Sequence, residues 1–271
     1  MPELPEVETT LRGISPYIEK QTITKVIVRQ HSLRWPIPVN LSTTLVNKTI
    51  IGIERRAKYL LLKTSDGALI IHLGMSGHLR ILSQSLPANK HDHVDLEFQN
   101  KKILRFNDPR RFGAFLWVDG NPLNHALLKH LGVEPLTKEL TGRYLWQIAQ
   151  NRKVSIKSFL MDNKVVTGIG NIYATEALFD AKIHPLAMAN SLSIERLSRL
   201  TQSCKKILKQ AIKRGGTTLK DFIHSDGKPG YFANQLKVYG RAGLSCLICN
   251  TTLHFIKIGQ RSTVYCNKCQ F

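Results

Sequence analysis

The sequence predicts an α+β protein of several parts, in which a leading helix and a β-rich part precede a helical part and a small four-cysteine module. Short β-branched runs separated by turn residues fill the first half of the chain, and helical periodicity follows from about Leu123. Four of the five cysteines lie in the last 26 residues. We place the domain boundaries so that the three parts are residues 1–122, 123–236 and 237–271.

The first part is expected to begin with a helix over residues 1–20. Glu6 favours the positive end of its dipole, and Val7, Leu11 and Ile14 form an apolar stripe. Regularly spaced short strands, which are typical of a β-sandwich or a β-barrel, should follow. They are expected at Lys25–Arg29, Thr49–Ile53, Tyr59–Lys63, Ala68–Leu73, Val94–Phe98, Lys102–Phe106 and Gly113–Val118.

The second part has the pattern of a helical domain. Helical segments are expected over Ser155–Met161 and Ile172–Ala181. A long helix should begin after Ser193, a good N-cap, and end before the glycine pair at Gly215. Cys204 lies on the apolar stripe of that helix, so we expect it in the core.

The third part has the cysteine spacing of a zinc ribbon. Cys246, Cys249, Cys266 and Cys269 form two C-x2-C pairs separated by 16 residues. Zinc takes four ligands at tetrahedral corners, and each pair offers two thiolates from one tight turn. A secreted disulfide framework would instead spread its cysteines along the chain. We therefore predict one structural Zn²⁺ ion, in a ribbon whose hairpin carries Arg261 at its tip.

The charge of the chain favours a polyanionic partner, and nucleic acid is the first candidate. Lys and Arg total 39 against 19 Asp and Glu, which gives a formal net charge of +20. The glycine-containing loop at residues 168–171 opens a helix, whose backbone N–H groups could bind a phosphate. No apolar run approaches the ~20 residues needed to span a bilayer. We expect a soluble intracellular protein with no membrane partner.

The N-terminus offers an unusual nucleophile. Removal of Met1 would expose the secondary amine of Pro2. An α-amino group has a pKa of about 7.7–8.0, against ~10.4 for lysine, so a useful fraction is neutral near pH 7. Covalent amine catalysis on a carbonyl-like carbon requires such a group, and Glu3 and Glu6 stand beside it as proton donors. From composition alone, an ordinary helix start with acids near its dipole is the simpler interpretation.

The opening Pro2-Glu3-Leu4-Pro5-Glu6-Val7-Glu8-Thr9 resembles that of the bacterial formamidopyrimidine-DNA glycosylases, bifunctional repair enzymes that remove oxidised purines. The resemblance covers essentially the whole chain, because further motifs follow in the order of that family. They are Arg55-Arg56-Ala57-Lys58-Tyr59-Leu60, His72-Leu73-Gly74-Met75-Ser76-Gly77, Lys90-His91-Asp92-His93-Val94, Asp108-Pro109-Arg110-Arg111-Phe112-Gly113, Met161-Asp162-Asn163-Lys164, Gly168-Ile169-Gly170-Asn171-Ile172-Tyr173, Gly215-Gly216-Thr217-Thr218-Leu219, Ser225-Asp226-Gly227-Lys228-Pro229-Gly230-Tyr231-Phe232, Val238-Tyr239-Gly240-Arg241 and the four cysteines.

The resemblance implies roles for individual residues. Pro2 would be the Schiff-base nucleophile at the sugar C1′ atom, and Glu3 the general acid for base loss and ring opening. Lys58 and Arg261 would donate protons in β- and δ-elimination. Matching DNA contacts are Met75, Arg110 and Phe112, which fill the void left by the extruded nucleotide, and His91, Asn171, Lys58 and Arg261 at phosphates, with Arg152 as a further basic contact. The loop from Thr217 to Tyr231 resembles the segment that closes over the damaged base.

The fold implied by the resemblance is a β-sandwich with a leading helix, a helix–two-turns–helix domain and a zinc ribbon. The implied function is excision of 8-oxoguanine and formamidopyrimidines from double-stranded DNA, with β,δ-elimination at the resulting or pre-existing abasic sites. We expect a monomer in the bacterial cytoplasm, associated with the nucleoid. Two alternatives stay open: an endonuclease VIII-type enzyme for oxidised pyrimidines, and a non-catalytic zinc-ribbon protein that binds nucleic acid.

Overall fold

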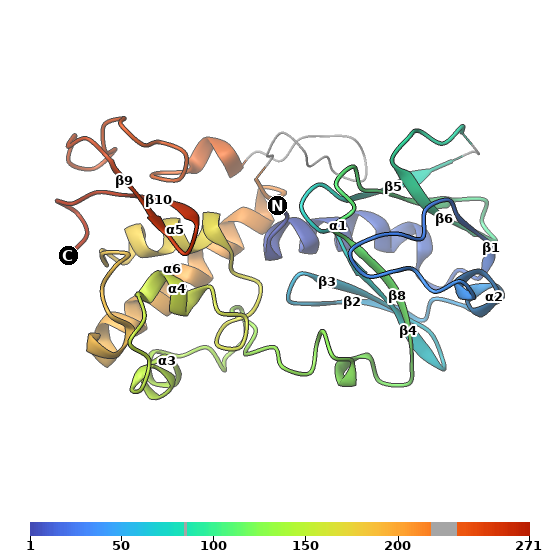
Figure 1. The fold of residues 1–271 in the computed structure, drawn as a ribbon, viewed down its shortest axis with the longest axis horizontal. Coiled ribbons are helices and arrows are strands. Elements are labelled where there is room, and N and C mark those ends of the chain that lie inside the picture. The colour runs from blue at the N-terminus through green and yellow to red at the C-terminus, as the bar shows by residue number, and fades with distance from the viewer. Residues whose placement is uncertain (84–85, 218–231) are drawn as a thin grey trace. The chain divides into compact units, whose positions relative to one another are not determined.

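The computed structural model describes residues 1–83, 86–217 and 232–271 of the chain (Figure 1). These residues form two compact units. Met1–Lys129 and the described residues that begin at Arg214 make the first unit, and His130–Lys213 with Phe232–Phe271 make the second. Within the described ranges, no helix combines the length and the apolar character needed to cross a bilayer.

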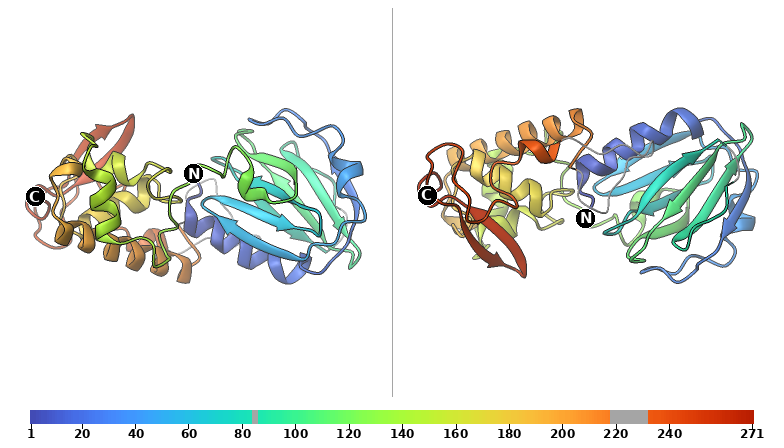
Figure 2. Two further views of the ribbon diagram at one scale, coloured as in Figure 1. Left: turned by 90° about the horizontal axis from the view of Figure 1, so that it is seen from below. Right: turned by 90° about the horizontal axis from the view of Figure 1, so that it is seen from above.

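The first unit is a β-sandwich with a leading helix, as predicted. Its two antiparallel sheets have the strand orders β1-β6-β7-β5 and β2-β3-β4-β8 (Figure 2). The helices are α1 (Leu4–Ile18), α2 (Leu41–Leu45) and the 3₁₀ turn η1 (Pro122–Asn124); the strands are β1 (Ile23–Val28), β2 (Gly52–Arg56), β3 (Tyr59–Lys63), β4 (Gly67–His72), β5 (His78–Leu82), β6 (Asp92–Phe98), β7 (Ile103–Asn107) and β8 (Ala114–Asp119).

The core of this unit lies between the two sheets and beneath α1. Leu96 and Phe106 come from one sheet, Leu62 and Phe115 come from the other, and Ile14 comes from the helix. All five side chains are at most 1% exposed. The apolar residues of α1 recur at helical spacing, so the helix buries one face, whereas β3 and β4 carry consecutive buried residues and are covered on both faces.

Three elements of the first unit differ from the sequence prediction, one of which is the short helix α2, which was not predicted. The strand expected over Thr49–Ile53 starts three residues late, at Gly52, and β5 was not predicted. The polar residues His78 and Arg80 interrupt the β-branched pattern of β5, and pairing with β7 defines it as a strand. Sheet pairing therefore overrides local propensity there.

The second unit is helical and ends in a β-hairpin. It contains α3 (Gly142–Ala149), α4 (Ile156–Leu160), α5 (Asn171–Asp180), α6 (Ile194–Lys213), the 3₁₀ turns η2 (Ala189–Ser191) and η3 (Phe232–Gln235), and the strands β9 (His254–Ile258) and β10 (Arg261–Tyr265). The predictions for α4, α5 and α6 are confirmed, and Cys204 is buried in α6 with 1% exposure. Helix α3 was not predicted; the Thr141 hydroxyl caps it by accepting a hydrogen bond from the N–H of Tyr144.

Candidate active site and nucleic-acid contacts

The chain start is buried against the first unit. Pro2 and Glu3 precede α1, and Glu3 is 2% exposed. The carboxylate of Glu6 accepts a 2.9 Å hydrogen bond from the N–H of Glu3 through Oε2 and a 2.8 Å bond from the N–H of Thr217 through Oε1. One buried carboxylate therefore joins the turn that carries Pro2 and Glu3 to the segment that follows α6.

Gly216 makes this junction possible. Its φ is +78°, in the left-handed region, and a Cβ atom there would lie 2.9 Å from Oε1 of Glu6. Only glycine adopts this conformation readily and leaves the carboxylate in place. Except for Thr217, the predicted lesion loop that ends at Tyr231 lies outside the described residues.

Lys58 lies in the two-residue turn between β2 and β3, and it is 9% exposed. Its neighbour Ala57 has a φ of +55°, as tight hairpin turns require. Arg55 donates from Nε to Glu8 of α1 at 3.0 Å and from Nη1 to the carbonyl of Ala57 at 2.9 Å. These bonds attach the turn that carries Lys58 to the helix that carries the N-terminal residues.

His72 is held neutral near Lys58. Burial, reinforced by repulsion from Lys58 and Arg34, lowers the pKa of His72 to about 4. Nδ1 of the ring accepts a 3.0 Å hydrogen bond from the N–H of Gly74, which leaves the proton of the neutral ring on Nε2. Sequence reasoning quoted His72 within a motif but gave it no role.

Met75, Arg110 and Phe112 lie on two turns that touch. A Cβ atom on Gly74 would lie 2.6 Å from the backbone nitrogen of Gly113, so the turns meet backbone to backbone. The Arg110 guanidinium carbon lies 5.0 Å from the centre of the Phe112 ring, in a cation–π arrangement. Phe112 is 41% exposed, so much of its ring is open to solvent.

Asp108 organises these turns and is fully buried. Its carboxylate accepts hydrogen bonds from the Ser76 hydroxyl at 3.0 Å and from the N–H of Gly113 at 2.8 Å. Its own N–H donates to the carbonyl of His91 at 3.0 Å. The half-buried His91, predicted at a phosphate, is thereby connected to the turns of Arg110 and Phe112.

In the second unit, Asn171 is the first residue of α5 and contacts a buried lysine. Lys157 is 1% exposed, and its Nζ donates to Asn171 Oδ1 at 2.6 Å, to Thr263 Oγ1 at 2.7 Å and to the carbonyl of Ser262 at 3.2 Å. Asn171 Nδ2 donates to the same Ser262 carbonyl at 3.0 Å. Lys157 thus joins α4, α5 and β10. Sequence reasoning missed it, because nothing local distinguishes it from a surface lysine.

Arg261 is exposed and directly precedes Ser262, whose carbonyl accepts hydrogen bonds from Lys157 and Asn171. Arg261 and Asn171 therefore both lie close to this carbonyl. It is the first residue of β10 and pairs with Ile258, whereas the turn itself is Gly259–Gln260. The residue expected at the hairpin tip therefore stands directly beside it. A pocket of about 220 Å³ is bordered by Arg261, Lys157, Ser158, Met161, Asp162, Ile258 and Gly259.

Arg152 is attached elsewhere in the second unit. Its guanidinium lies 3.4 Å from a carboxylate oxygen of Asp162, and its side chain is 43% exposed. Asp162 also borders the pocket of Arg261. A partly exposed ion pair of this kind contributes ~0–1 kcal/mol, so it leaves Arg152 able to exchange partners.

The four cysteines of the C-terminal module form one cluster. Their sulfur atoms all lie within 4.8 Å of one another, with 3.9 Å between Cys246 and Cys269 and 3.5 Å between Cys249 and Cys266. Such a set of thiols can hold a metal ion. Phe179 of α5 packs against the module, so the cluster is joined to the helical part by an apolar contact.

A buried glutamate of α5 fixes the segment that leads into this module. Glu176 is 4% exposed and accepts hydrogen bonds from three successive backbone N–H groups: Lys237 at 2.9 Å, Val238 at 2.9 Å and Tyr239 at 2.8 Å. Burial raises the pKa of Glu176, and the three donors oppose that shift. Sequence reasoning missed Glu176, because its partners lie some sixty residues further along the chain.

Comparisons with known proteins match both units. The model of the formamidopyrimidine-DNA glycosylase N-terminal domain matches residues 1–115, and that of the family's helix–two-turns–helix domain matches residues 131–223. The chain is 55% identical over 270 residues to the formamidopyrimidine-DNA glycosylase of Ectopseudomonas mendocina, and 54% identical over 271 residues to that of Marinobacter nauticus, with all of each chain covered.

Solved structures agree with these matches. The MutM (Fpg) protein of Thermus thermophilus superposes with a TM-score of 0.89 and 34% identity, covering 99% of this chain and 98% of that one. The Lactococcus lactis Fpg in complex with DNA containing an abasic site superposes with a TM-score of 0.91 and 35% identity, covering 99% of each chain. The chain therefore belongs to the formamidopyrimidine-DNA glycosylase family of base excision repair enzymes.

Proposed function

We propose that this chain excises oxidised purines, namely 8-oxoguanine and formamidopyrimidines, from double-stranded DNA and then cleaves the strand at the abasic site. The observation that carries the proposal is the buried chain start, where Pro2 and Glu3 stand ahead of α1 in the unit that also holds Lys58. Family membership and the excess of 39 basic over 19 acidic residues support a DNA substrate.

The chemistry begins once Met1 is removed. The lone pair of the Pro2 nitrogen forms a bond to C1′ of the lesion, and the glycosidic bond breaks as the base leaves with a proton donated by Glu3. The Glu3 carboxylate then takes the proton of the alkylated nitrogen and passes it to the sugar ring oxygen, so that the ring opens and an iminium forms at C1′. Glu3 is 2% exposed and stands next to Pro2, which places its carboxyl beside the reacting nitrogen for this role.

Strand cleavage follows from the iminium, which makes the C2′ proton acidic. Loss of that proton breaks the C3′–O bond, and a second elimination breaks the C5′–O bond. Water then releases Pro2 from the sugar remnant. We assign Lys58 as a proton donor in the first elimination and Arg261 in the second, and both cations would also bind phosphates.

DNA binding would use side chains from both units. A base must leave the duplex before an amine can reach its sugar, at a cost of a few kcal/mol. Met75, Arg110 and Phe112 would fill the void, a role supported by the exposed Phe112 ring and its contact with Arg110. Phosphate contacts are proposed for His91 and Asn171, and a further basic contact is proposed for Arg152.

We also propose that the four cysteines hold one structural Zn²⁺ ion. Tetrahedral Zn–S bonds of ~2.3 Å separate the sulfurs by about 3.8 Å, which agrees with the 3.5 Å and 3.9 Å separations in the cluster. Bound zinc would take up the four thiolate charges and fix the two cysteine turns. Four thiolates leave no position for a reacting water, so Cys246, Cys249, Cys266 and Cys269 would serve structure alone.

The remaining expectations complete this proposal. We propose that the chain works as a monomer on the DNA of the bacterial nucleoid. Its three functional parts would be residues 1–122, 123–236 and 237–271.

The test is strand cleavage combined with trapping. The protein should nick an 8-oxoguanine duplex, and borohydride should reduce the iminium to a stable adduct that mass mapping assigns to Pro2. A form that retains Met1 is the matched control, because its Pro2 nitrogen is a tertiary amide without an available lone pair. A sugar remnant on Lys58 would overturn the mechanism. Cleavage of an oxidised-pyrimidine duplex alone would favour the endonuclease VIII-type alternative, and binding without cleavage would favour a non-catalytic protein.

A further inference from the structure

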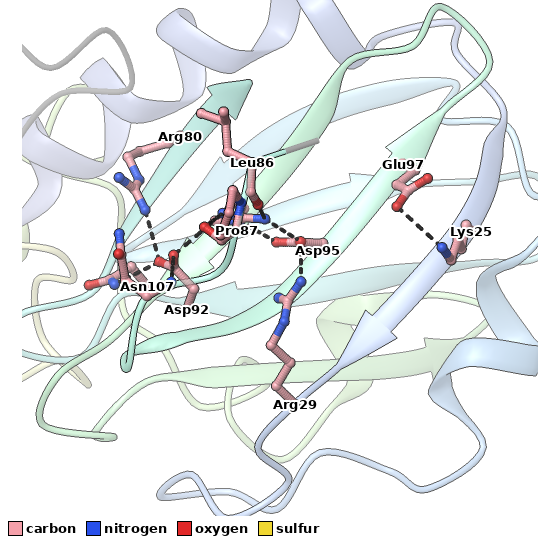
Figure 3. A network of polar contacts seen from close by, with 11 residues as sticks. Lys25, Arg29, Arg80, Leu86, Pro87, Asp92, Asp95, Glu97 and Asn107 are labelled. Atoms are coloured by element: carbon pink, nitrogen blue, oxygen red, sulfur yellow. Dashed lines mark hydrogen bonds and ion pairs between the residues drawn. The ribbon is translucent and has the colours of Figure 1, made fainter. Parts of the chain in front are cut away.

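A buried arginine lies on the face of β7 that points away from the sandwich core. Leu104 and Phe106 face the core, so the alternation of the strand turns Arg105 to the opposite face, where it is 2% exposed. Arg105 donates from Nε and Nη2 to the two carboxylate oxygens of Asp95, each at 2.8 Å. Arg29 donates to Asp95 as well, at 2.6 Å (Figure 3).

A strand irregularity brings a second carboxylate to the same face. Asp95 pairs with Arg105, and Asp92 pairs with Asn107, but the register shifts between Asp92 and Val94. Residues three apart in a regular strand face opposite sides, so the extra residue turns Asp92 toward Asp95. Asp92 accepts hydrogen bonds from Asn107 and Arg80, each at 2.8 Å (Figure 3).

These side chains hold the backbone of the segment that precedes β6. Arg105 donates from Nη2 to the carbonyl of Leu86 at 2.9 Å and from Nη1 to the carbonyl of Pro87 at 3.2 Å. Asp92 accepts a 2.8 Å hydrogen bond from the N–H of Asn89. Three backbone groups within residues 86–89 are thus bound by two buried side chains, and Figure 3 shows Leu86 and Pro87 beside Asp92 and Asp95.

The residues directly after this segment are Lys90 and His91. They border a pocket of about 260 Å³ whose further cationic and imidazole groups are Arg29, His93 and Arg111. The acid at this pocket is Asp92, which is already bound to Arg80 and Asn107. A backbone phosphate is therefore the group that this pocket fits.

Stability alone explains the buried network poorly. Removing charged groups from water costs several kcal/mol each, and a well-packed apolar cluster is often at least as stable as a buried ion pair. The fork of Arg105 does what an apolar residue cannot, because it orients two carbonyl groups and a carboxylate at once. The network therefore determines the backbone conformation of residues 86–89.

We propose that Arg105 is a positioning residue for DNA binding, which with Asp92 fixes residues 86–89 so that Lys90 and His91 meet a phosphate of the duplex. This inference rests on the proposed function only in taking DNA as the partner. It assigns Arg105 no contact with DNA and no part in the bond-breaking steps.

The test variant is Arg105→Lys, which keeps the charge but replaces the planar fork, with its four hydrogen bonds to Asp95 and the carbonyls of Leu86 and Pro87, by three N–H groups on one nitrogen. We expect its Kd for an undamaged duplex to rise about tenfold, since a charge-assisted contact is lost. The slope of log K against log[salt] should become less steep by ~0.9, the value for one phosphate contact. On a lesion duplex, KM should rise while kcat stays unchanged.

Two comparisons separate positioning from loss of stability. Leu104→Ala weakens the same strand from its core face without touching residues 86–89, and it should leave the salt slope unchanged. In a Lys90→Ala/His91→Ala background, Arg105→Lys should cause no further loss of affinity. The proposal is overturned if Arg105→Lys reduces duplex affinity equally in that background. It is also overturned if Arg105→Lys leaves the slope of log K against log[salt] unchanged, or lowers kcat without raising KM.

A second variant covers the case in which Arg105→Lys does not fold. Asn89 is exposed, and Asn89→Pro removes the N–H group that donates to Asp92 while the buried ion pairs stay intact. The slope of log K against log[salt] should become less steep, as it should in Arg105→Lys. An unchanged slope in Asn89→Pro would contradict the proposal. The binding measurements use undamaged duplex, so they do not depend on whether the protein excises lesions. The proposed function fails on a different result, namely that the wild type does not cleave lesion DNA.

Discussion

Lys157 Nζ donates a 2.6 Å hydrogen bond to Asn171 Oδ1 from a position that is 1% exposed. The same ammonium binds Thr263 and Ser262 of β10. A fully buried lysine is tolerated because three acceptors surround it. Its contacts fix the side chain at the start of α5 relative to the strand that begins with Arg261, so one buried charge determines the relative position of two proposed DNA contacts.

Replacing this lysine should therefore affect both stability and DNA binding. Lys157→Met keeps the length of the side chain but removes the donor to Asn171 Oδ1 and to the buried Thr263 Oγ1, at about 1–3 kcal/mol for a buried acceptor left unpaired. We expect a lower Tm and weaker duplex affinity. Lys209→Met, an exposed position on α6, removes the same charge and is the control. If both variants lose affinity equally, Lys157 contributes charge and not geometry.

The glycine at the Glu6 junction should be irreplaceable. Gly216→Ala forces a side chain into a φ of +78° and against Oε1 of Glu6, at about 1–3 kcal/mol for the backbone conformation alone. We expect it to lower Tm and to reduce excision of 8-oxoguanine. Gly120→Ala is the matched control, because Gly120 has a φ of +69° with nothing within 4 Å of its Cβ position. Equal effects of the two variants would mean that the contact with Glu6 is unimportant.

His72 should make the protein less stable in mild acid. Its folded pKa of about 4 lies below the ordinary 6.5, so the unfolded chain binds the proton more readily between those values. The contribution of the neutral His72 ring to the free energy of unfolding is complete above pH 6.5 and is lost as the pH falls toward 4. The stability difference between wild type and His72→Asn should change over that window and stay constant above it.

The imidazole resonances provide a direct measurement of the same group. In NMR titration, the His72 signals should move near pH 4, and Lys58→Met should raise the pKa because one repelling charge is removed. Titration of His72 near pH 6.5 in the wild type would contradict the burial described above.

Metal removal should affect the second unit selectively. Cys249→Ser should lose the bound zinc, disorder the hairpin of β9 and β10, and weaken duplex binding, while the β-sandwich stays folded. Metal analysis and the methyl NMR signals of the sandwich core measure the two parts. Cys204→Ala, at a buried position outside the cluster, should keep the metal. Full affinity of Cys249→Ser without zinc would show that the four-thiolate site has no part in DNA binding.

The sequence allowed the fold to be predicted wherever the signal is local. Short β-branched runs separated by turn residues identified most strands, and the paired cysteines identified their own module. The buried network could not be predicted in this way. Lys157 meets Ser262 across 105 positions and Glu176 meets Lys237 across 61, so each polar residue is indistinguishable from a surface one until the chain is folded. Asp92 and Asp95 share a face only through an irregularity in β6, which strict alternation hides.

Phe112 should act in base extrusion and not in packing. Its ring is 41% exposed and stacks on Arg110, so Phe112→Ala should change Tm little. Stacking of a base on an aromatic ring contributes ~1–3 kcal/mol, so excision of 8-oxoguanine from duplex should fall about 5- to 150-fold. Cleavage of a single-stranded abasic substrate, which leaves no void, should survive much better. Tyr17→Ala, at a 44% exposed aromatic position on α1, is the control and should affect neither reaction. Equal losses of Phe112→Ala on both substrates, accompanied by a fall in Tm, would identify Phe112 as a packing residue.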